Sequence, residues 1–248
     1  MKAASRSKKI YLIRHGSTPW TRAQRYQGRT DLRLNVRGRR EIRSLIKLME
    51  KPGPEKVYVS GLRRAAESAA ILNKVWKVPL IVDLRLNELS FGRWEGQTGR
   101  QLIAAKDRRY RSWCRGRDIS PPGGESFRRL RRRIARFVKD LRAAPVTRAA
   151  VVAHGGSIRM ILAVLLGFRA RQFWSFKLDP ASLTVVTLGT NYAQCEMLNL
   201  TAARVRFGRM GLHPKFCARV LTGRKKDNPW DTSGKAHLHP SLFEGISH

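Results

Sequence analysis

Acidic residues, cysteines and long apolar runs are all scarce in this sequence. Only 3 cysteines occur among 248 residues. Cys114, Cys195 and Cys217 are too widely spaced for a disulfide framework or a zinc-binding pattern, so we interpret them as buried or incidental thiols. No apolar run approaches the roughly 20 residues that a membrane-spanning helix needs, and the run 10–13 is too short for the core of a signal peptide. We therefore expect no membrane span and a cytoplasmic location.

The shortage of acidic residues leaves a large positive charge. Lysine and arginine total 51 against 17 aspartates and glutamates, which gives a formal net charge of +34. Such a charge repels itself, attracts polyanions and makes stability depend on salt. The basic residues are spread along the whole chain, so an arginine-rich lineage explains them at least as well as a dedicated polyanion site. Nonspecific nucleic-acid binding at low salt is consistent with this charge, and does not by itself establish a function.

The length and the apolar content are sufficient for a sizeable core. The chain has 248 residues, of which 42% are hydrophobic. Regular periodicity extends over residues 8–200, which we interpret as one domain, and fades in a basic C-terminal extension, 201–248, rich in Gly, Pro, Lys and His. His237 and His239 in that extension have no neighbouring cysteine or carboxylate ligands, so the pattern does not favour a metal site there.

Strand-like and helix-like patterns alternate along the domain. Asn35 is a predicted N-cap, and Ser126 follows a rigid turn before a second amphipathic helix whose arginines, Arg131–Arg133, we expect to be solvated. Short apolar runs predict strands at 10–13, 57–59, 80–82, 149–153, 183–188 and 195–200, and helical spacing predicts helices at 36–49, 62–72, 127–141 and 158–165.

Two of the predicted strands end in a histidine followed by glycine. The run 10–13 leads into Arg14, His15 and Gly16, and the run 149–153 leads into His154. In an open α/β sheet, ligands bind outside the carboxyl ends of the strands, which is where these side chains would lie. Taken alone, however, Arg14 and His15 are equally consistent with polar residues that simply leave a strand.

Arginines at the start of the helix after Ser60 provide a second indication. Arg63 and Arg64 oppose the helix dipole there, an arrangement that favours a bound anion. Two solvated surface arginines explain the same pattern equally well.

Five motifs together resemble the histidine phosphatase superfamily, also called phosphoglycerate mutase-like. Each motif is weak alone, but they occur in the family's order between about residue 8 and about residue 200. They are Arg14–Thr18, Ser60–Ala65, Leu86–Glu88 with Phe91–Gly96, Pro122–Ser126, and His154–Arg159. The spacing after Glu88 is similar to that of the phosphatase branch, including α-ribazole phosphatases. The resemblance implies an α/β three-layer sandwich, with a mixed, mostly parallel sheet and helices on both faces.

The resemblance also implies how a phosphoryl group would be held. His15 matches the nucleophile, and a neutral imidazole suits that role because it can attack near physiological pH. Arg14, Arg64 and His154 match the residues that surround the phosphate. Such cationic donors stabilise the charge that magnesium stabilises in kinases, so we predict no metal and no cofactor.

Other positions are implied to handle protons and substrate. Glu88 matches the proton donor, which should be partly desolvated. Gln27, Thr21 and Gly155 are the predicted substrate-binding positions. Thr21 departs from the family, because the mutases and many of the phosphatases carry an asparagine there, so one phosphate contact is altered or lost. Outside this set, we expect Glu95 and Glu125 to hold loops, for instance by pairing with arginines.

The predicted function is a metal-independent phosphatase that hydrolyses a small phosphorylated metabolite through a phosphohistidine. A cofactor-dependent phosphoglycerate mutase is the alternative enzyme. A polyanion-binding protein on a weakly active phosphatase scaffold is the alternative of another class, supported by the charge. Neither the physiological substrate nor the oligomeric state follows from the sequence.

Overall fold

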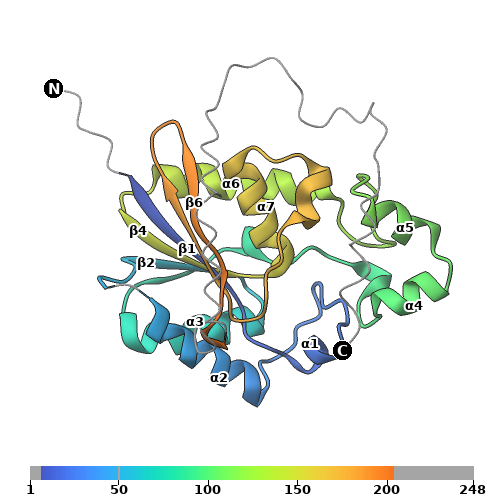
Figure 1. The fold of residues 1–248 in the computed structure, drawn as a ribbon, viewed down its shortest axis with the longest axis horizontal. Coiled ribbons are helices and arrows are strands. Elements are labelled where there is room, and N and C mark those ends of the chain that lie inside the picture. The colour runs from blue at the N-terminus through green and yellow to red at the C-terminus, as the bar shows by residue number, and fades with distance from the viewer. Residues whose placement is uncertain (1–6, 50, 204–248) are drawn as a thin grey trace.

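Six strands form one mixed sheet in the order β3-β2-β4-β1-β5-β6 (Figure 1). The structure is a computed structural model that describes residues 7–49 and 51–203. Parallel pairs join β1 to β4, β4 to β2 and β2 to β3, whereas β5 is antiparallel to both β1 and β6. The strands are β1 (Lys8–Arg14), β2 (Lys56–Val59), β3 (Leu80–Val82), β4 (Arg148–Ala153), β5 (Leu183–Leu188) and β6 (Ala193–Leu200). All six predicted strands and the mixed, mostly parallel character of the sheet are thus confirmed.

Helices cover both faces of the sheet, which makes three layers (Figure 1). On β1, Ile10 and Leu12 are buried in the core cluster that includes the apolar residues of α6 and α7, while Tyr11 and Ile13 are buried in the cluster on the side of α2 and α3. Because β1 is buried on both faces, it is a continuous apolar run rather than an alternating one. The covering helices are α2 (Val36–Leu45), α3 (Arg63–Trp76), α6 (Phe127–Ala143) and α7 (Gly155–Leu166).

Shorter helical segments complete the described chain. The segment 96–122 contains two short helices, and Tyr110 and Trp113 of the second pack against Trp94. The shorter segments are α1 (Pro19–Arg22), α4 (Gly99–Ala104) and α5 (Arg108–Cys114), with 3-10 turns at Ile46–Leu48, Leu84–Leu86, Gly92–Trp94 and Ala170–Ser175. Among the helices of residues 7–49 and 51–203, none combines the length and the apolarity that crossing a membrane requires.

The predicted helix caps are present, but the prediction of a solvated arginine face on α6 is wrong in part. Asn35 Oδ1 accepts a hydrogen bond from Gly38 N at 2.8 Å, and Ser126 Oγ accepts one from Arg129 N at 3.2 Å. Arg132 is exposed as expected, whereas Arg131 is half-buried. Arg133 instead turns into the protein, with 16% of its side chain exposed, because Glu125 and three backbone carbonyls receive its guanidinium.

Several sequence predictions concern residues outside the described part. Cys114 and Cys195 are free, partly buried thiols. Cys217, His237, His239 and almost all of the proposed extension 201–248 lie beyond Ala203, where the description ends.

Candidate active site

The register of β1 against β4 brings the two predicted histidines together. Arg14 pairs with Ala153 across the parallel ladder, and the backbone N–H of His15 donates to Ala153 O at 3.0 Å. The residue after each strand is a histidine, so their rings meet just beyond the carboxyl ends of the two strands. The ring centroids of His15 and His154 are 5.1 Å apart and the planes are tilted by 57°. Both side chains are buried.

The surroundings of His15 favour a neutral ring with one free nitrogen. Nδ1 lies 2.7 Å from Gly16 O, and because a carbonyl oxygen can only accept, Nδ1 carries the proton. The lone pair of the neutral ring is therefore on Nε2. Burial, together with the nearby charges of Arg64 and Arg14, lowers the pKa of His15 well below its ordinary value.

His154 belongs to a hydrogen-bond chain that fixes its tautomer. Its Nε2 lies 2.7 Å from Ser60 Oγ, and that hydroxyl donates to Asn87 Oδ1 at 2.8 Å. The N–H of Gly61 also donates to Asn87 Oδ1, at 2.8 Å, which orients the amide. Ser60 therefore accepts from His154, and Nε2 carries the proton of the neutral ring.

The other nitrogen of His154, Nδ1, is left unused by the described residues. Nδ1 is buried and has no hydrogen-bond partner among the described residues. Burial is the largest cause that lowers the pKa of His154 well below its ordinary value, followed by the charge of Arg64. A bound anion would oppose the charge effect and favour protonation of Nδ1.

Arg14 and Arg64 place two desolvated cations at the same cavity. Arg64 is fully buried, and its two terminal nitrogens donate to Thr30 O at 2.8 Å and Gly28 O at 2.7 Å. Arg14 Nη1 donates to Leu178 O at 2.5 Å. The Nε groups of both arginines are buried without a partner in residues 7–49 and 51–203. Burial lowers the pKa of Arg64 to about 10, so an anion here would stabilise charges that the fold has partly desolvated.

Glu88 is buried and held by backbone donors. Its Oε1 accepts from Leu89 N at 2.8 Å, and its Oε2 accepts from Gly156 N at 3.1 Å in the first turn of α7. Its negative charge opposes the burial-induced lowering of the pKa of Arg14 and of Arg64. This side chain therefore meets the expectation of partial desolvation at the site.

The predicted substrate-binding positions also lie at this cavity, whose volume is about 370 Å³. Thr21 Oγ1 accepts hydrogen bonds from Thr18 N at 2.9 Å and, more weakly, from Gln27 Nε2 at 3.4 Å. The cavity is lined by the predicted residues Arg14, His15, Thr21, Gln27, Arg64, Glu88 and Gly155, and by Gln24, Arg25, Tyr26, Gly28, Leu89, Phe91, Gly156, Arg159, Phe173, Trp174 and Pro180. Of the predicted site residues, His154 alone does not line the cavity, and it lies behind His15, whose ring it approaches to 5.1 Å between centroids.

Arg159 is a lining residue for which the sequence predicted no role. Its Nε donates to Phe176 O at 2.8 Å and its guanidinium lies over Trp174, 5.3 Å from the ring centroid. Burial is the main cause that lowers its pKa to about 10. The sequence feature that could have indicated a role is its position five residues after His154, near the start of the same helix α7.

The two loop acids have the structural roles expected of them. Glu95 accepts from the backbone N–H groups of Arg29 and Thr30, each at 2.9 Å, and of Phe91 at 3.1 Å. Glu125 forms a bidentate pair with Arg133, at 2.8 Å for each contact. Neither acid lines the cavity.

The described residues also bear on metal binding. In the ranges 7–49 and 51–203, no three His, Cys, Asp or Glu side chains are grouped so that they could hold a metal ion. Metal independence stays a prediction that a chelator can test.

Comparison with known proteins places these observations in a family. A family model for the Histidine phosphatase superfamily (branch 1) matches residues 10–201. The chain is 28% identical over 199 residues to the adenosylcobalamin/alpha-ribazole phosphatase of Escherichia coli K12, covering 79% of this chain and 98% of that protein. It is 27% identical to phosphoserine phosphatase 1 of Hydrogenobacter thermophilus, covering 78% and 92%. The solved structure of a mycobacterial glucosyl-3-phosphoglycerate phosphatase is similar with a TM-score of 0.70 and 27% identity, covering 78% and 99%.

Proposed function

Because the chain belongs to the histidine phosphatase superfamily and is a hydrolase of phosphate esters, we propose that it acts through a phosphohistidine at His15, without a metal ion. The observation that carries this proposal is the state of His15. The contact with Gly16 O leaves Nε2 with the lone pair, and burial keeps the ring neutral. A neutral buried imidazole beside two cationic side chains is a nucleophile adjacent to an anion site.

In the first step, His15 Nε2 attacks phosphorus while the bond from phosphorus to the ester oxygen breaks. Glu88, protonated at this stage, gives its proton to the departing alkoxide, which leaves as an alcohol. Arg14, Arg64 and His154 stabilise the charge on the nonbridging oxygens. Nε of Arg14, Nε of Arg64 and Nδ1 of His154 have no hydrogen-bond partner among the described residues, which supports the assignment.

In the second step, the Glu88 carboxylate takes a proton from water as the water oxygen attacks the phosphohistidine. The bond from phosphorus to Nε2 breaks, the electron pair returns to His15, and inorganic phosphate leaves. Glu88 is then protonated again and the site is restored.

The size and lining of the cavity support the proposal that the substrate is a small phosphorylated metabolite. The cavity exceeds what one phosphoryl group would fill, and its wall includes Arg159 and the aromatic residues Tyr26, Phe173 and Trp174. The relatives are named for phosphoserine, α-ribazole and glucosyl-3-phosphoglycerate. We place the leaving alcohol against Arg159 and Trp174, with an anionic substituent near the guanidinium. The cytoplasmic location stays a prediction.

The decisive experiment is phosphate release from 4-nitrophenyl phosphate in the presence of a chelator. We expect wild-type protein to release phosphate at an unchanged rate with chelator and His15→Ala to release none. The Arg132→Gln variant, changed at an exposed position, controls for loss of one positive charge and should behave as wild type. Unchanged release by His15→Ala would refute the phosphohistidine.

The same preparations distinguish the phosphatase from the mutase. Release without a bisphosphorylated primer supports the phosphatase, whereas primer-dependent isomerisation of a phosphorylated sugar acid without release would support the mutase. Loss of release in the presence of chelator would instead indicate a metal requirement.

A further inference from the structure

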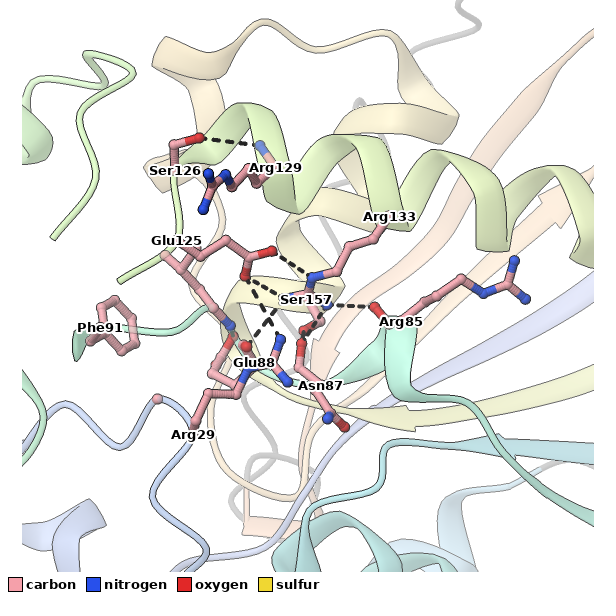
Figure 2. Close-up of polar contacts among 12 residues, drawn as sticks. Arg29, Arg85, Asn87, Glu88, Phe91, Glu125, Ser126, Arg129, Arg133 and Ser157 are labelled. Atoms are coloured by element: carbon pink, nitrogen blue, oxygen red, sulfur yellow. Dashed lines mark hydrogen bonds and ion pairs between the residues drawn. The ribbon is translucent and has the colours of Figure 1, made fainter. Parts of the chain in front are cut away.

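Arg133 makes an unusual number of contacts for a side chain from a helix face rich in arginine. It donates five hydrogen bonds, two to Glu125 and three to backbone carbonyls of the segment that ends at Glu88 (Figure 2). Arginine has five N–H donors in a planar fork, and the number of hydrogen bonds made by Arg133 equals the number of these donors. The residue does not line the cavity.

One edge of the guanidinium is fixed by Glu125. Arg133 Nε and Nη2 each donate to a different carboxylate oxygen at 2.8 Å. Only 13% of the Glu125 side chain is exposed, so solvent screens the pair weakly. The backbone N–H of Glu125 donates to Ser90 O at 2.9 Å, so the backbone that carries this carboxylate is itself tied to the loop after Glu88.

The other side of the guanidinium holds the segment that carries Glu88. Nη1 donates to Arg85 O at 2.5 Å and to Asn87 O at 2.6 Å, and Nη2 donates to Glu88 O at 3.1 Å. The hydroxyl of Ser157, on α7, also donates to Asn87 O at 2.8 Å (Figure 2). Since these carbonyls are fixed from outside the cavity, the direction in which the Glu88 side chain leaves the backbone is fixed as well.

From these contacts we infer that Arg133, oriented by Glu125, is the positioning residue for the proton donor Glu88. This inference rests on the proposed function, in which Glu88 protonates the leaving alcohol. Loss of the guanidinium frees the carbonyls of Arg85 and Glu88 and leaves Asn87 O with Ser157 alone. The Glu88 carboxyl then shifts away from the position in which it faces the ester oxygen. A misplaced acid slows the reaction most where the leaving group most needs a proton.

Lysine cannot replace this arginine. An ammonium group is a point charge on a flexible stem and cannot reach a carboxylate and three carbonyls in one plane. Arg133→Lys therefore keeps the charge but loses the positioning. It also keeps a cation beside Glu125, whereas Arg133→Gln would leave that buried carboxylate with Arg29 alone, 4.0 Å away. Arg133→Lys is therefore the variant with the better prospect of folding.

The test is the dependence of kcat/KM on the leaving group. Phosphate release is measured with 2,4-dinitrophenyl, 4-nitrophenyl and phenyl phosphate, in order of increasing need for a proton, because kcat/KM reports the step that forms the phosphohistidine. The proteins compared are wild type, Arg133→Lys, Arg133→Gln, Glu88→Gln and the exposed control Arg132→Gln. Circular dichroism and thermal unfolding establish that each is folded.

We expect Arg133→Lys and Glu88→Gln to lose about 100-fold with phenyl phosphate and less than about tenfold with the dinitrophenyl ester. Arg132→Gln should match wild type. An equal loss on all three esters by folded Arg133→Lys, with Glu88→Gln still selective, would overturn the inference and leave the proposed function intact. A nonselective Glu88→Gln would refute the role of Glu88 itself, and with it the role of Arg133.

Discussion

Gly156 and Glu88 are in such close contact that any side chain at position 156 would displace the acid. The Gly156 N–H donates to Glu88 Oε2, and a Cβ placed on Gly156 would lie 2.4 Å from Glu88 Oε1. Position 156 therefore requires glycine, because only a residue without a side chain lets the start of α7 approach the Glu88 carboxyl this closely.

Gly156→Ala should accordingly reduce activity through Glu88. The added methyl would push the carboxyl away from the cavity, and a displacement of about 1 Å can cost about 100-fold in rate. The measurement is kcat/KM with phenyl phosphate, alongside thermal unfolding. Wild-type activity in the folded variant would show that Glu88 tolerates the shift or takes no part in the reaction.

The two buried histidines predict that stability depends on pH. Burial is the largest cause of the lowered pKa of each, so in the fold both stay neutral below their ordinary value of about 6.5. The unfolded chain then binds more protons than the folded chain, and the free energy of unfolding falls as pH drops through about 6.5. Each histidine contributes up to about 1.4 kcal/mol per pH unit in that window.

Urea unfolding between about pH 5 and about pH 7.5 measures this dependence. We expect a lower midpoint at the acid end for wild type and a flatter profile for His154→Gln, which removes one of the two groups. A profile as steep in His154→Gln as in wild type would contradict the assignment.

Ser60→Ala should impair the orientation of His154. The substitution removes the acceptor of Nε2 and one donor to Asn87 Oδ1 in a fully buried position. We expect a loss of about tenfold or more in kcat/KM that is similar for all three aryl phosphates, since phosphate contact rather than leaving-group protonation is affected. A loss confined to phenyl phosphate would instead assign Ser60 to the positioning of Glu88.

Arg159→Gln should separate substrate binding from chemistry. The guanidinium of Arg159 lines the cavity and lies over Trp174, where it would contact the carboxylate of phosphoserine. We therefore expect a higher KM for phosphoserine and little change with propyl phosphate, whose alcohol carries no charge. Arg169→Gln, at an exposed position beyond the end of α7, is the matched control. Equal effects on both substrates would show that Arg159 contacts the phosphoryl group or supports the fold.

The net charge of +34 predicts nucleic-acid binding that weakens steeply with salt. Fluorescence anisotropy with two unrelated DNA duplexes should show similar affinities that fall together as salt rises. A sequence preference that persists at physiological salt would support the polyanion-binding alternative.

Much of the architecture could be predicted from the sequence because it is encoded locally. Apolar runs such as 10–13 and 149–153 are the signature of strands buried on both faces, and residues such as Asn35 and Ser126 cap their helices through contacts only three residues away. Two parallel strands that each end in a histidine place those histidines at the same edge of a sheet. The motifs for Arg14, His15, Glu88 and His154 are likewise short and local.

Only the tertiary structure decided which of three successive arginines contacts the segment that carries Glu88. Arg131, Arg132 and Arg133 are the same residue type on one helix, yet Arg133 meets carbonyls 45 to 48 residues earlier in the chain. The hydrogen bonds from Asn87 through Ser60 to His154 likewise join residues 27 and 94 positions apart. Sequence patterns report the periodicity of a single element, whereas these contacts depend on how α6, α7 and the Glu88 loop pack in space. The local pattern therefore determined the fold and the position of the proposed nucleophile His15, and packing determined how Glu88 and His154 are held.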